Sequence, residues 1–209
     1  MKRRQRGLQA GWYRGGGKRC LDLVLSLAML VLMAPLLLLS AIAIKLESRG
    51  PVLFIQARLG RGGRTFRVVK LRTMTDRPRQ NRLQVFGDDC DMTRVGRWLR
   101  RTKIDELPQL WNVIRGEMSV VGPRPGLPEQ LSEYDERARR RLDVRPGLTG
   151  WAQVNGNVHL SWPQRWCYDA WYVDHHSLAL DSWIVVRTVA VVGCGEKTFA
   201  RRSNARRAA

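Results

Sequence analysis

The sequence predicts a mainly helical α+β fold held at a membrane: a monotopic protein with a re-entrant, proline-broken N-terminal helix and a small β-hairpin. Two observations predict this class. An apolar run extends from Leu21 to Ile44 with Pro35 in its middle, and two short apolar segments follow it on either side of a glycine-rich turn. At 209 residues the chain fits one domain with a core of its own.

The apolar run is long enough to cross a membrane. Its 24 residues reach about 36 Å as a straight helix, against a hydrocarbon core of about 30 Å. Pro35 removes a backbone hydrogen bond and predicts a bend at Ala34–Pro35. Basic residues flank both ends, so the positive-inside rule singles out neither end as translocated. A helix over residues 18–46 that enters the membrane and returns to the cytoplasmic face satisfies both observations. The alternative is a kinked helix that spans the membrane.

The chain is strongly basic, with 37 lysines and arginines against 18 acidic residues and a net charge of +19. Such a charge needs an anionic partner, and the ordinary candidates are anionic membrane lipid and nucleic acid. Residues 1–17 are expected to be a basic, disordered N-terminus, and residues 196–209 a basic tail. The four cysteines form no CxxC pair, so neither a zinc site nor a disulfide framework is predicted.

A β-hairpin is expected directly after the membrane helix. Residues 52–56 and 65–70 each have the composition of a strand, and the glycine-rich segment 60–64 separates them. The glycine cluster could instead cradle a phosphate. It lacks the spacing of a Walker motif and opens no helix, so a plain turn is the preferred interpretation.

Asp105 lies between two expected helices. Thr93 is a suitable N-cap for a helix that ends near Arg101. Asp105 is expected to begin the next helix, because Pro108 is tolerated only in a first turn. A carboxylate at a helix N-terminus is favoured in its ionised form by the exposed backbone amides.

The C-terminal half is expected to be helical and rich in tryptophan. A charged helix over residues 128–142, a helix over 163–173 and an apolar helix over 183–192, capped by Asp181, are predicted. Amphipathic rings beside basic residues are typical of interfacial helices, although each single tryptophan is equally compatible with a core position. The tryptophans in question are Trp162, Trp166, Trp171 and Trp183.

Asp105 and Glu106 are adjacent carboxylates in a chain otherwise rich in arginine. Such carboxylates can bind Mg²⁺, and an ionised aspartate can attack phosphorus to form an aspartyl phosphate. Successive helical residues point about 100° apart, so the two acids are expected to divide their roles. Arg124 stands between two prolines, and a guanidinium on a stiff loop is suited to grip a phosphate. Further phosphate-binding candidates are Arg72, Arg101 and Arg145.

A series of short motifs runs in order along residues 18–190. They are Ala34–Pro35, Gly50–Phe54, Lys70–Met74, Thr93–Gly96, Asp105–Leu110, Gly116–Pro125 and Arg145–Gly156. In this order they resemble the compact form of the bacterial sugar transferase family, the monotopic phosphoglycosyl transferases that act on polyprenyl phosphate. Two positions depart from the family pattern. Ala34 stands where serine is common, and Asp91 stands where arginine is common.

The resemblance implies a catalytic domain over residues 47–195, with interfacial helices, on the cytoplasmic face of the bacterial inner membrane. It implies transfer of a phosphosugar from a UDP-sugar to polyprenyl (undecaprenyl) phosphate with release of UMP, the first membrane step of glycan assembly. In this ping-pong reaction Asp105 is the nucleophile. Glu106 either binds metal, positions the lipid phosphate or deprotonates it. Asp105 and Glu106 would hold Mg²⁺, Arg124 would hold phosphate, and Asp169 would help to bind the nucleotide.

Two other classes of function stay open at this point. A membrane-tethered nucleic-acid-binding protein would explain the net charge but gives the Asp105–Glu106 pair no task, so no nucleic-acid partner is expected. An inactive scaffold that anchors other glycan enzymes would not need Asp105, Glu106 and Arg124 intact. A homodimer is compatible with the sequence.

Overall fold

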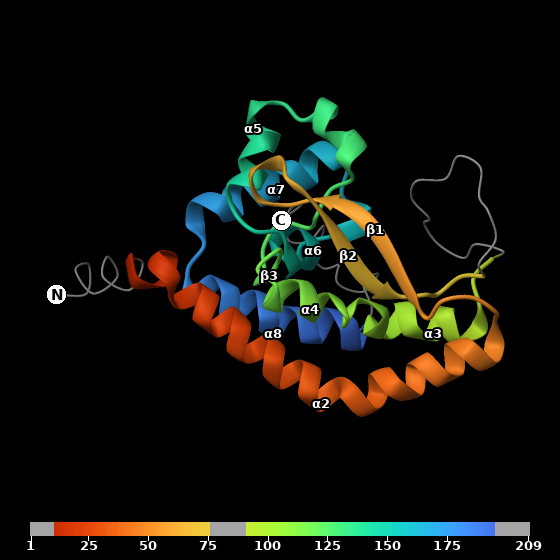
Figure 1. Cartoon of the computed structure of the whole chain (residues 1–209). Coiled ribbons are helices and arrows are strands. Elements are labelled where there is room, and N and C mark those ends of the chain that lie inside the picture. The colour runs from red at the N-terminus through yellow and green to blue at the C-terminus, as the bar shows by residue number, and fades with distance from the viewer. Residues whose placement is uncertain (1–10, 76–90, 195–209) are drawn as a thin grey trace.

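The computed structural model describes residues 11–75 and 91–194 (Figure 1). The expectations for residues 1–10 and for the basic tail lie outside these ranges. Residues 11–17 differ from the expected disordered N-terminus, because they continue the first long helix as a π-helical turn, Tyr13–Gly17. Tyr13 is buried there and donates a hydrogen bond to Asp181, 2.5 Å away, which holds this end of the chain against the domain.

Along helix α2 (Lys18–Glu47) three polar side chains are buried and most of the large apolar side chains are exposed. Asp22, Ser26 and Ser40 are buried against the protein. The large exposed hydrophobic residues are Val24, Leu25, Leu27, Met29, Val31, Leu32, Leu38, Leu39, Ile42 and Leu46. The helix is long and apolar enough to cross a membrane, with a mean hydropathy of 2.7 over its most apolar stretch, of which 11% is buried. This inverted polarity indicates association with a membrane.

The predicted bend is present. Pro35 lies inside α2, which changes direction in its middle (Figure 1). Proline cannot donate its backbone hydrogen bond and crowds the preceding turn, so a helix bends at this residue. The hydroxyl of Ser40 donates to the carbonyl of Leu36, the residue after the proline, at 2.8 Å.

The predicted hairpin is confirmed. Strands β1 (Leu53–Leu59) and β2 (Thr65–Leu71) pair antiparallel along their whole length. Gly62 and Gly63 between them have φ angles of 68° and 76°, which side chains disfavour. The glycine cluster is therefore a turn, as preferred from the sequence.

A second, parallel pair of strands was not predicted. It joins β3 (Ser119–Val121) to β4 (Gly147–Thr149). The backbones approach so closely that a Cβ on Gly147 would lie 2.1 Å from the amide nitrogen of Gly122. This pair determines where the loop after β3, which carries Arg124, leaves the core.

The helices before β3 and after β4 in the chain agree in part with those predicted from the sequence. Helix α3 (Arg94–Thr102) begins as predicted, with the side chain of Thr93 accepting from the amide of Gly96 at 2.9 Å. Short helices α4 (Gln109–Ile114) and α6 (Trp151–Val154) follow. Helix α7 (Trp162–His175) confirms another prediction.

The single helix expected over residues 128–142 is wrong. Two 3₁₀ segments, Pro128–Glu133 and Arg140–Asp143, flank the short helix α5 (Glu136–Arg139). Tyr134 is extended, and the side chain of Asp135 accepts from the amide of Ala138 at 2.6 Å, so a new helix begins there.

Helix α8 (Leu178–Cys194) begins earlier than predicted. Asp181 is therefore not its cap. It lies inside the first turn, is buried, and accepts hydrogen bonds from Tyr13, Lys18 and Tyr172.

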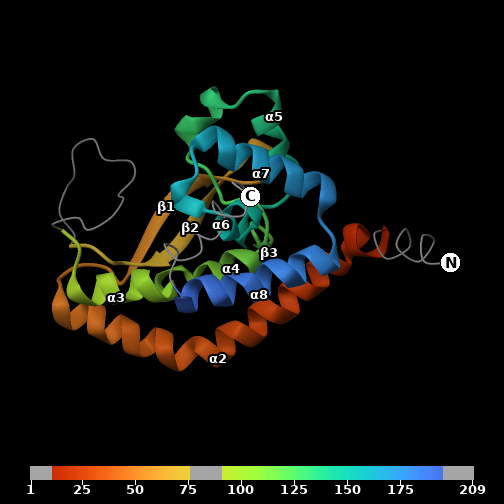
Figure 2. The ribbon, with the colours of Figure 1, turned by 180° about the vertical axis from the view of Figure 1, so that it is seen from behind.

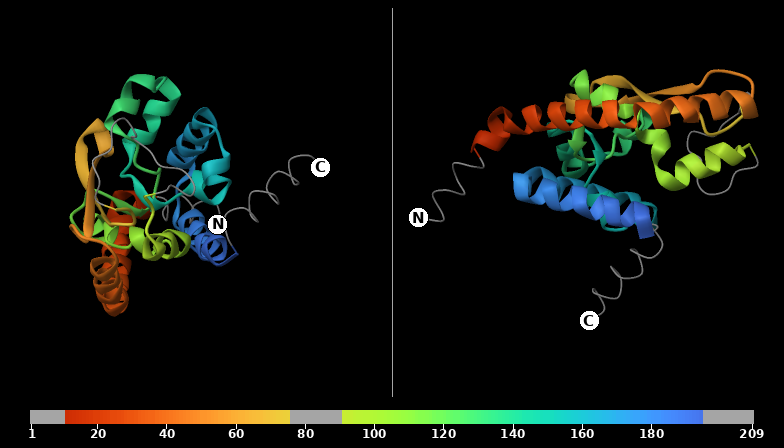
Figure 3. Two further views of the ribbon diagram at one scale, coloured as in Figure 1. Left: turned by 90° about the vertical axis from the view of Figure 1, so that its right-hand side faces the viewer. Right: turned by 90° about the horizontal axis from the view of Figure 1, so that it is seen from below.

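The elements form layers in which α2 is outermost. Figures 1 and 2 show α3, α4 and α8 in the next layer, and α5 and α7 at the opposite end. Seen from below in Figure 3, α2, α3 and α8 extend along the same face. The exposed large hydrophobic side chains of α3 and α8 include Trp98, Trp183, Val186 and Val189. The mainly helical α+β class is confirmed, and one apolar face is suited to a lipid surface.

Candidate active site

The two adjacent acids lie on a 3₁₀ turn, Ile104–Glu106, where α3 ends. Lys103 closes α3 with a φ of 60°, a conformation uncommon for a residue with a side chain. Ile104 packs in a core cluster with Ile44 of α2, Leu71 of β2 and Leu99 of α3. Helix α2, the hairpin and α3 therefore hold the turn together in one core cluster.

Glu106 is buried and bound by two cations. The ammonium of Lys70 donates to Oε1 at 2.8 Å. The guanidinium of Arg124 donates to Oε1 at 2.7 Å and to Oε2 at 3.3 Å. Burial alone would raise the pKa of Glu106, but Arg124 and Lys70 hold that pKa well below its usual range. Glu106 is therefore ionised and has both oxygens engaged.

Asp105 is the acid with a free oxygen. It is 6% exposed, and its buried Oδ1 has no hydrogen-bond partner. Burial, and then the charge of Glu106, raise the pKa of Asp105 from 3.8 to about 6. The sequence placed Asp105 at the start of a helix, but it lies inside a 3₁₀ turn, and desolvation raises its pKa instead of lowering it. Above pH 6 this carboxylate is charged, poorly solvated and unpaired, which are the properties of a nucleophile.

Sequence reasoning missed two cations of the site, Lys70 and Arg58, although both lie in the hairpin. Lys70 is near the end of β2, and burial lowers its pKa. Burial, and then repulsion by Arg124, lower the pKa of Arg58 to about 10. Arg58 donates to the side chain of Gln56 at 2.7 Å. The strand pattern alone does not show that these side chains approach residues 105–124, although Lys70 begins one of the motifs that resemble the family.

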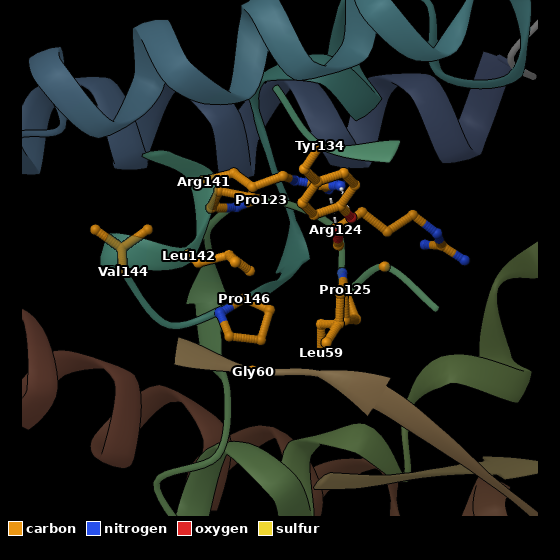
Figure 4. Close-up of a pocket in the computed structure, with 11 residues that line it drawn as sticks. Leu59, Gly60, Pro123, Arg124, Pro125, Tyr134, Arg141, Leu142, Val144 and Pro146 are labelled. Carbon is orange, nitrogen blue, oxygen red and sulfur yellow. Dashed lines mark hydrogen bonds between the residues drawn. The ribbon is translucent and has the colours of Figure 1, made fainter. Parts of the chain in front are cut away.

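Arg124 is carried by a loop that neighbouring backbone groups hold on both sides. The carbonyl of Pro123 accepts from Gly147 at 2.8 Å, and the carbonyl of Gly126 accepts from Leu59 at 2.9 Å. Figure 4 shows the side chain of Arg124 extending away from Tyr134 and Arg141. Arg124 was predicted to grip a phosphate; here its guanidinium binds Glu106.

Four other predicted substrate-binding residues do not meet the acidic pair in the described structure. Arg72 is buried and donates to the carbonyl and hydroxyl of Ser48. Arg145 donates to the carbonyl of Gly116 at 2.8 Å. The remaining two are Asp169, buried beside Arg141, and Arg101, exposed on α3.

The fit to Mg²⁺ depends mainly on Asp105. No group of three or more His, Cys, Asp or Glu side chains is arranged as a metal site within residues 11–75 and 91–194. Mg²⁺ commonly takes only one or two protein carboxylates and completes its shell with phosphate oxygens and water. The unpartnered Oδ1 of Asp105 fits such a shared site, whereas Glu106 would first have to release a cation.

Comparisons with known proteins show which family the chain resembles. The family model "Bacterial sugar transferase" matches residues 13–195. The chain is 42% identical to "Uncharacterized sugar transferase EpsL" of Bacillus subtilis over 175 residues, which is 84% of this chain and 86% of that protein.

Two further relatives cover similar parts of the chain. The chain is 50% identical over 184 residues to "UDP-glucose:undecaprenyl-phosphate glucose-1-phosphate transferase" of Caulobacter vibrioides, which is 82% of this chain and 68% of the relative. It is 37% identical over 194 residues to "Exopolysaccharide production protein ExoY" of Sinorhizobium fredii, which is 85% of this chain and 86% of that protein.

Proposed function

The chain belongs to the bacterial sugar transferase family, and from this premise we propose that it transfers a sugar 1-phosphate from a UDP-sugar to undecaprenyl phosphate in polysaccharide synthesis. One observation carries the proposal. Asp105 has a buried, unpartnered oxygen beside a Glu106 that is already paired with two cations. A free nucleophile next to fixed positive charge is what phosphoryl transfer requires.

The reaction proceeds in two displacements. Oδ1 of Asp105 attacks the β-phosphorus of the UDP-sugar, and the bond from that phosphorus to the bridging oxygen breaks. UMP leaves with the bridging oxygen, and the phosphosugar stays on Asp105. An oxygen of undecaprenyl phosphate then attacks the same phosphorus and releases the carboxylate, which gives undecaprenyl diphosphate-sugar.

Glu106 acts by position and charge. A carboxylate whose pKa is held well below its usual range is a weak base, so deprotonation of the lipid phosphate is the less suitable of the roles considered for it. It holds Lys70 and Arg124 beside Asp105, where their charge offsets that of the incoming diphosphate. Bound Mg²⁺ supplies further neutralisation of the diphosphate.

The outward apolar face and the central bend of α2 support a re-entrant path in the inner membrane. Both ends of the helix then lie on the cytoplasmic side, where the water-soluble UDP-sugar is available. The carrier lipid reaches the same site from within the leaflet, and anionic lipid pairs with the basic surface.

The re-entrant path predicts that both ends of α2 are reached from the cytoplasm alone. In a cysteine-free background, Gly11→Cys and Arg49→Cys place single thiols at exposed positions before and after the helix. We expect a membrane-impermeant maleimide to label both in inverted vesicles and neither in spheroplasts. Labelling of one of them in spheroplasts would establish the spanning helix instead.

The raised pKa of Asp105 predicts an acid limit close to pH 6 for the first displacement. Only the ionised carboxylate attacks, so the single-turnover rate of UMP release is expected to be flat above about pH 7 and to fall about tenfold per pH unit below 6. Rapid-quench measurement between pH 4.5 and 8.5 checks this. A rate that stays unchanged down to pH 4.5 would mean that the pKa of Asp105 is not raised.

UMP release by the purified full chain tests the proposed function. Separate UDP-sugars are supplied with Mg²⁺, with and without undecaprenyl phosphate. We expect one or a few sugars to give a stoichiometric burst without lipid, a matching mass increase on the protein, and turnover only when lipid is present. Lipid-dependent product without any burst or adduct would contradict the covalent route, and no UMP from any donor would contradict the activity.

A further inference from the structure

We propose that Arg141 and Asp169 are positioning residues, which hold the backbone of Arg124 so that its guanidinium stays on Glu106. This inference rests on the proposed function, because it concerns the same site. It gives Asp169 a different task from the nucleotide contact that the sequence suggested, and it adds Arg141, which the sequence did not single out.

A single buried guanidinium joins three parts of the chain. Nη2 of Arg141 lies 2.9 Å from Oδ2 of Asp169 on α7, and the same nitrogen donates to the carbonyl of Arg124 at 2.5 Å. Nη1 donates to the hydroxyl of Tyr134 at 2.6 Å. The side chains of Arg141 and Asp169 are 5% and 3% exposed. The planar guanidinium presents fixed donors on two separate nitrogens to these three acceptors, a geometry that the single nitrogen of an ammonium does not offer.

One side of the Arg124 loop lines a small pocket, together with the apolar side chains of Leu59, Leu142, Val144 and Pro146 (Figure 4). The backbone bonds at Pro123 and Gly126 hold the two flanks of the loop. The bond from Arg141 holds Arg124 in the middle of the loop, and the Arg124 side chain extends away from Arg141 (Figure 4) and binds Glu106.

The energetics of buried charge also favour a positioning role. A buried ion pair costs desolvation on both sides, and an apolar replacement of similar size is often as stable. A bond to the carbonyl of Arg124 is something that no apolar side chain supplies. A displacement of about 1 Å at a catalytic group can cost about 10²-fold in rate, so a small shift of this loop matters.

The chain contains a matched control. Arg140, the neighbour of Arg141, pairs with Asp174 and so ties the same 3₁₀ segment to the same helix α7. Its side chain is 48% exposed, and its bond is made to Asp174 rather than to the loop. If Arg141 merely fastened this segment to α7, Arg140→Met would have the same kind of effect.

A double-mutant cycle in UMP release tests the inference. We expect Arg141→Met and Asp169→Asn to lower kcat by about 10- to 100-fold with KM for the UDP-sugar changed much less. Arg140→Met is expected to stay near the wild type. In an Arg124→Ala background, Arg141→Met is expected to cost nothing further, because its target is gone. An equal loss in both backgrounds would overturn the inference.

Two further measurements keep the test independent of folding and of the activity itself. Should Arg141→Met fail to fold, Tyr134→Phe removes one anchor of the guanidinium while preserving the ion pair, and the same cycle with Arg124→Ala applies. Amide hydrogen exchange at Gly126 and Leu127 is expected to accelerate in Arg141→Met and not in Arg140→Met, whether or not the protein releases UMP. Unchanged exchange in Arg141→Met would contradict the positioning role.

Discussion

Asp105→Asn is expected to abolish UMP release, lowering the single-turnover rate by at least about 10⁴-fold. Asparagine has nearly the same shape and fits the same buried turn, but its amide oxygen does not attack phosphorus at a useful rate. Neither the burst of UMP nor the mass increase on the protein is expected. The remaining rate is measured with the donor that is best for the wild type. The affinity for that donor is expected to persist, which separates loss of the nucleophile from loss of binding.

The same substitution is expected to stabilise the protein. The folded-state pKa of Asp105 is raised from 3.8 to about 6, so its protonation favours folding below pH 3.8 and this contribution is lost as the pH rises through about 6. At neutral pH the ionised side chain opposes folding, by an amount on the order of 3 kcal/mol. Asparagine removes that cost, and the midpoint of thermal unfolding is expected to rise by several degrees at pH 7.5 and by much less at pH 4.

The control is Asp143→Asn, which changes an exposed aspartate of the same domain. It is expected to leave both the rate and the unfolding midpoint unchanged. Retained UMP release in Asp105→Asn would remove Asp105 from the reaction. A lowered midpoint at pH 7.5 would show that its charge is better compensated than its free oxygen indicates.

Local patterns predicted the elements whose signals are local. The membrane helix follows from one apolar run and one proline, the hairpin from two strands around a glycine turn, and the start of α3 from Thr93. Strands β3 and β4 were not predicted, because they have three residues each and pair Ser119 with Gly147, which lie far apart in the sequence. The helix expected over residues 128–142 is broken because Asp135 caps a new helical turn. The charge pattern of this segment is the same for a broken and for a continuous helix.

The residues of the candidate site likewise divide into those with a local sequence signal and those without one. Asp105, Glu106 and Arg124 stand out in the sequence, because paired acids and a proline-flanked arginine are unusual there. Their partners do not. Lys70 meets Glu106 across 36 positions of the chain, and Arg141 reaches the carbonyl of Arg124 across 17. Whether an arginine faces substrate, a carboxylate or a backbone carbonyl depends on tertiary packing, so several arginines predicted to bind phosphate have other partners.

Glu106→Gln is expected to have the opposite effect on stability from Asp105→Asn, although both replace a buried acid with its amide. The carboxylate of Glu106 pairs with Lys70 and Arg124, and glutamine leaves both cations without that charge. Breaking one partner of a buried pair typically costs about 3–5 kcal/mol, and the partial exposure of Arg124 reduces this to roughly 2–3 kcal/mol. A lowered unfolding midpoint is therefore expected, with exposed Glu133→Gln as the neutral control.

The kinetic consequences of Glu106→Gln distinguish its role from that of the nucleophile. We expect kcat for UMP release to fall by about 10²- to 10³-fold without being abolished, because two cations are no longer held beside Asp105. The charge of Glu106 helps to raise the pKa of Asp105, so its removal is expected to move the acid limit of the reaction below pH 6. An acid limit that stays at pH 6 would mean that burial alone sets the pKa of Asp105. Complete loss of the burst would assign Glu106 a direct part in bond formation.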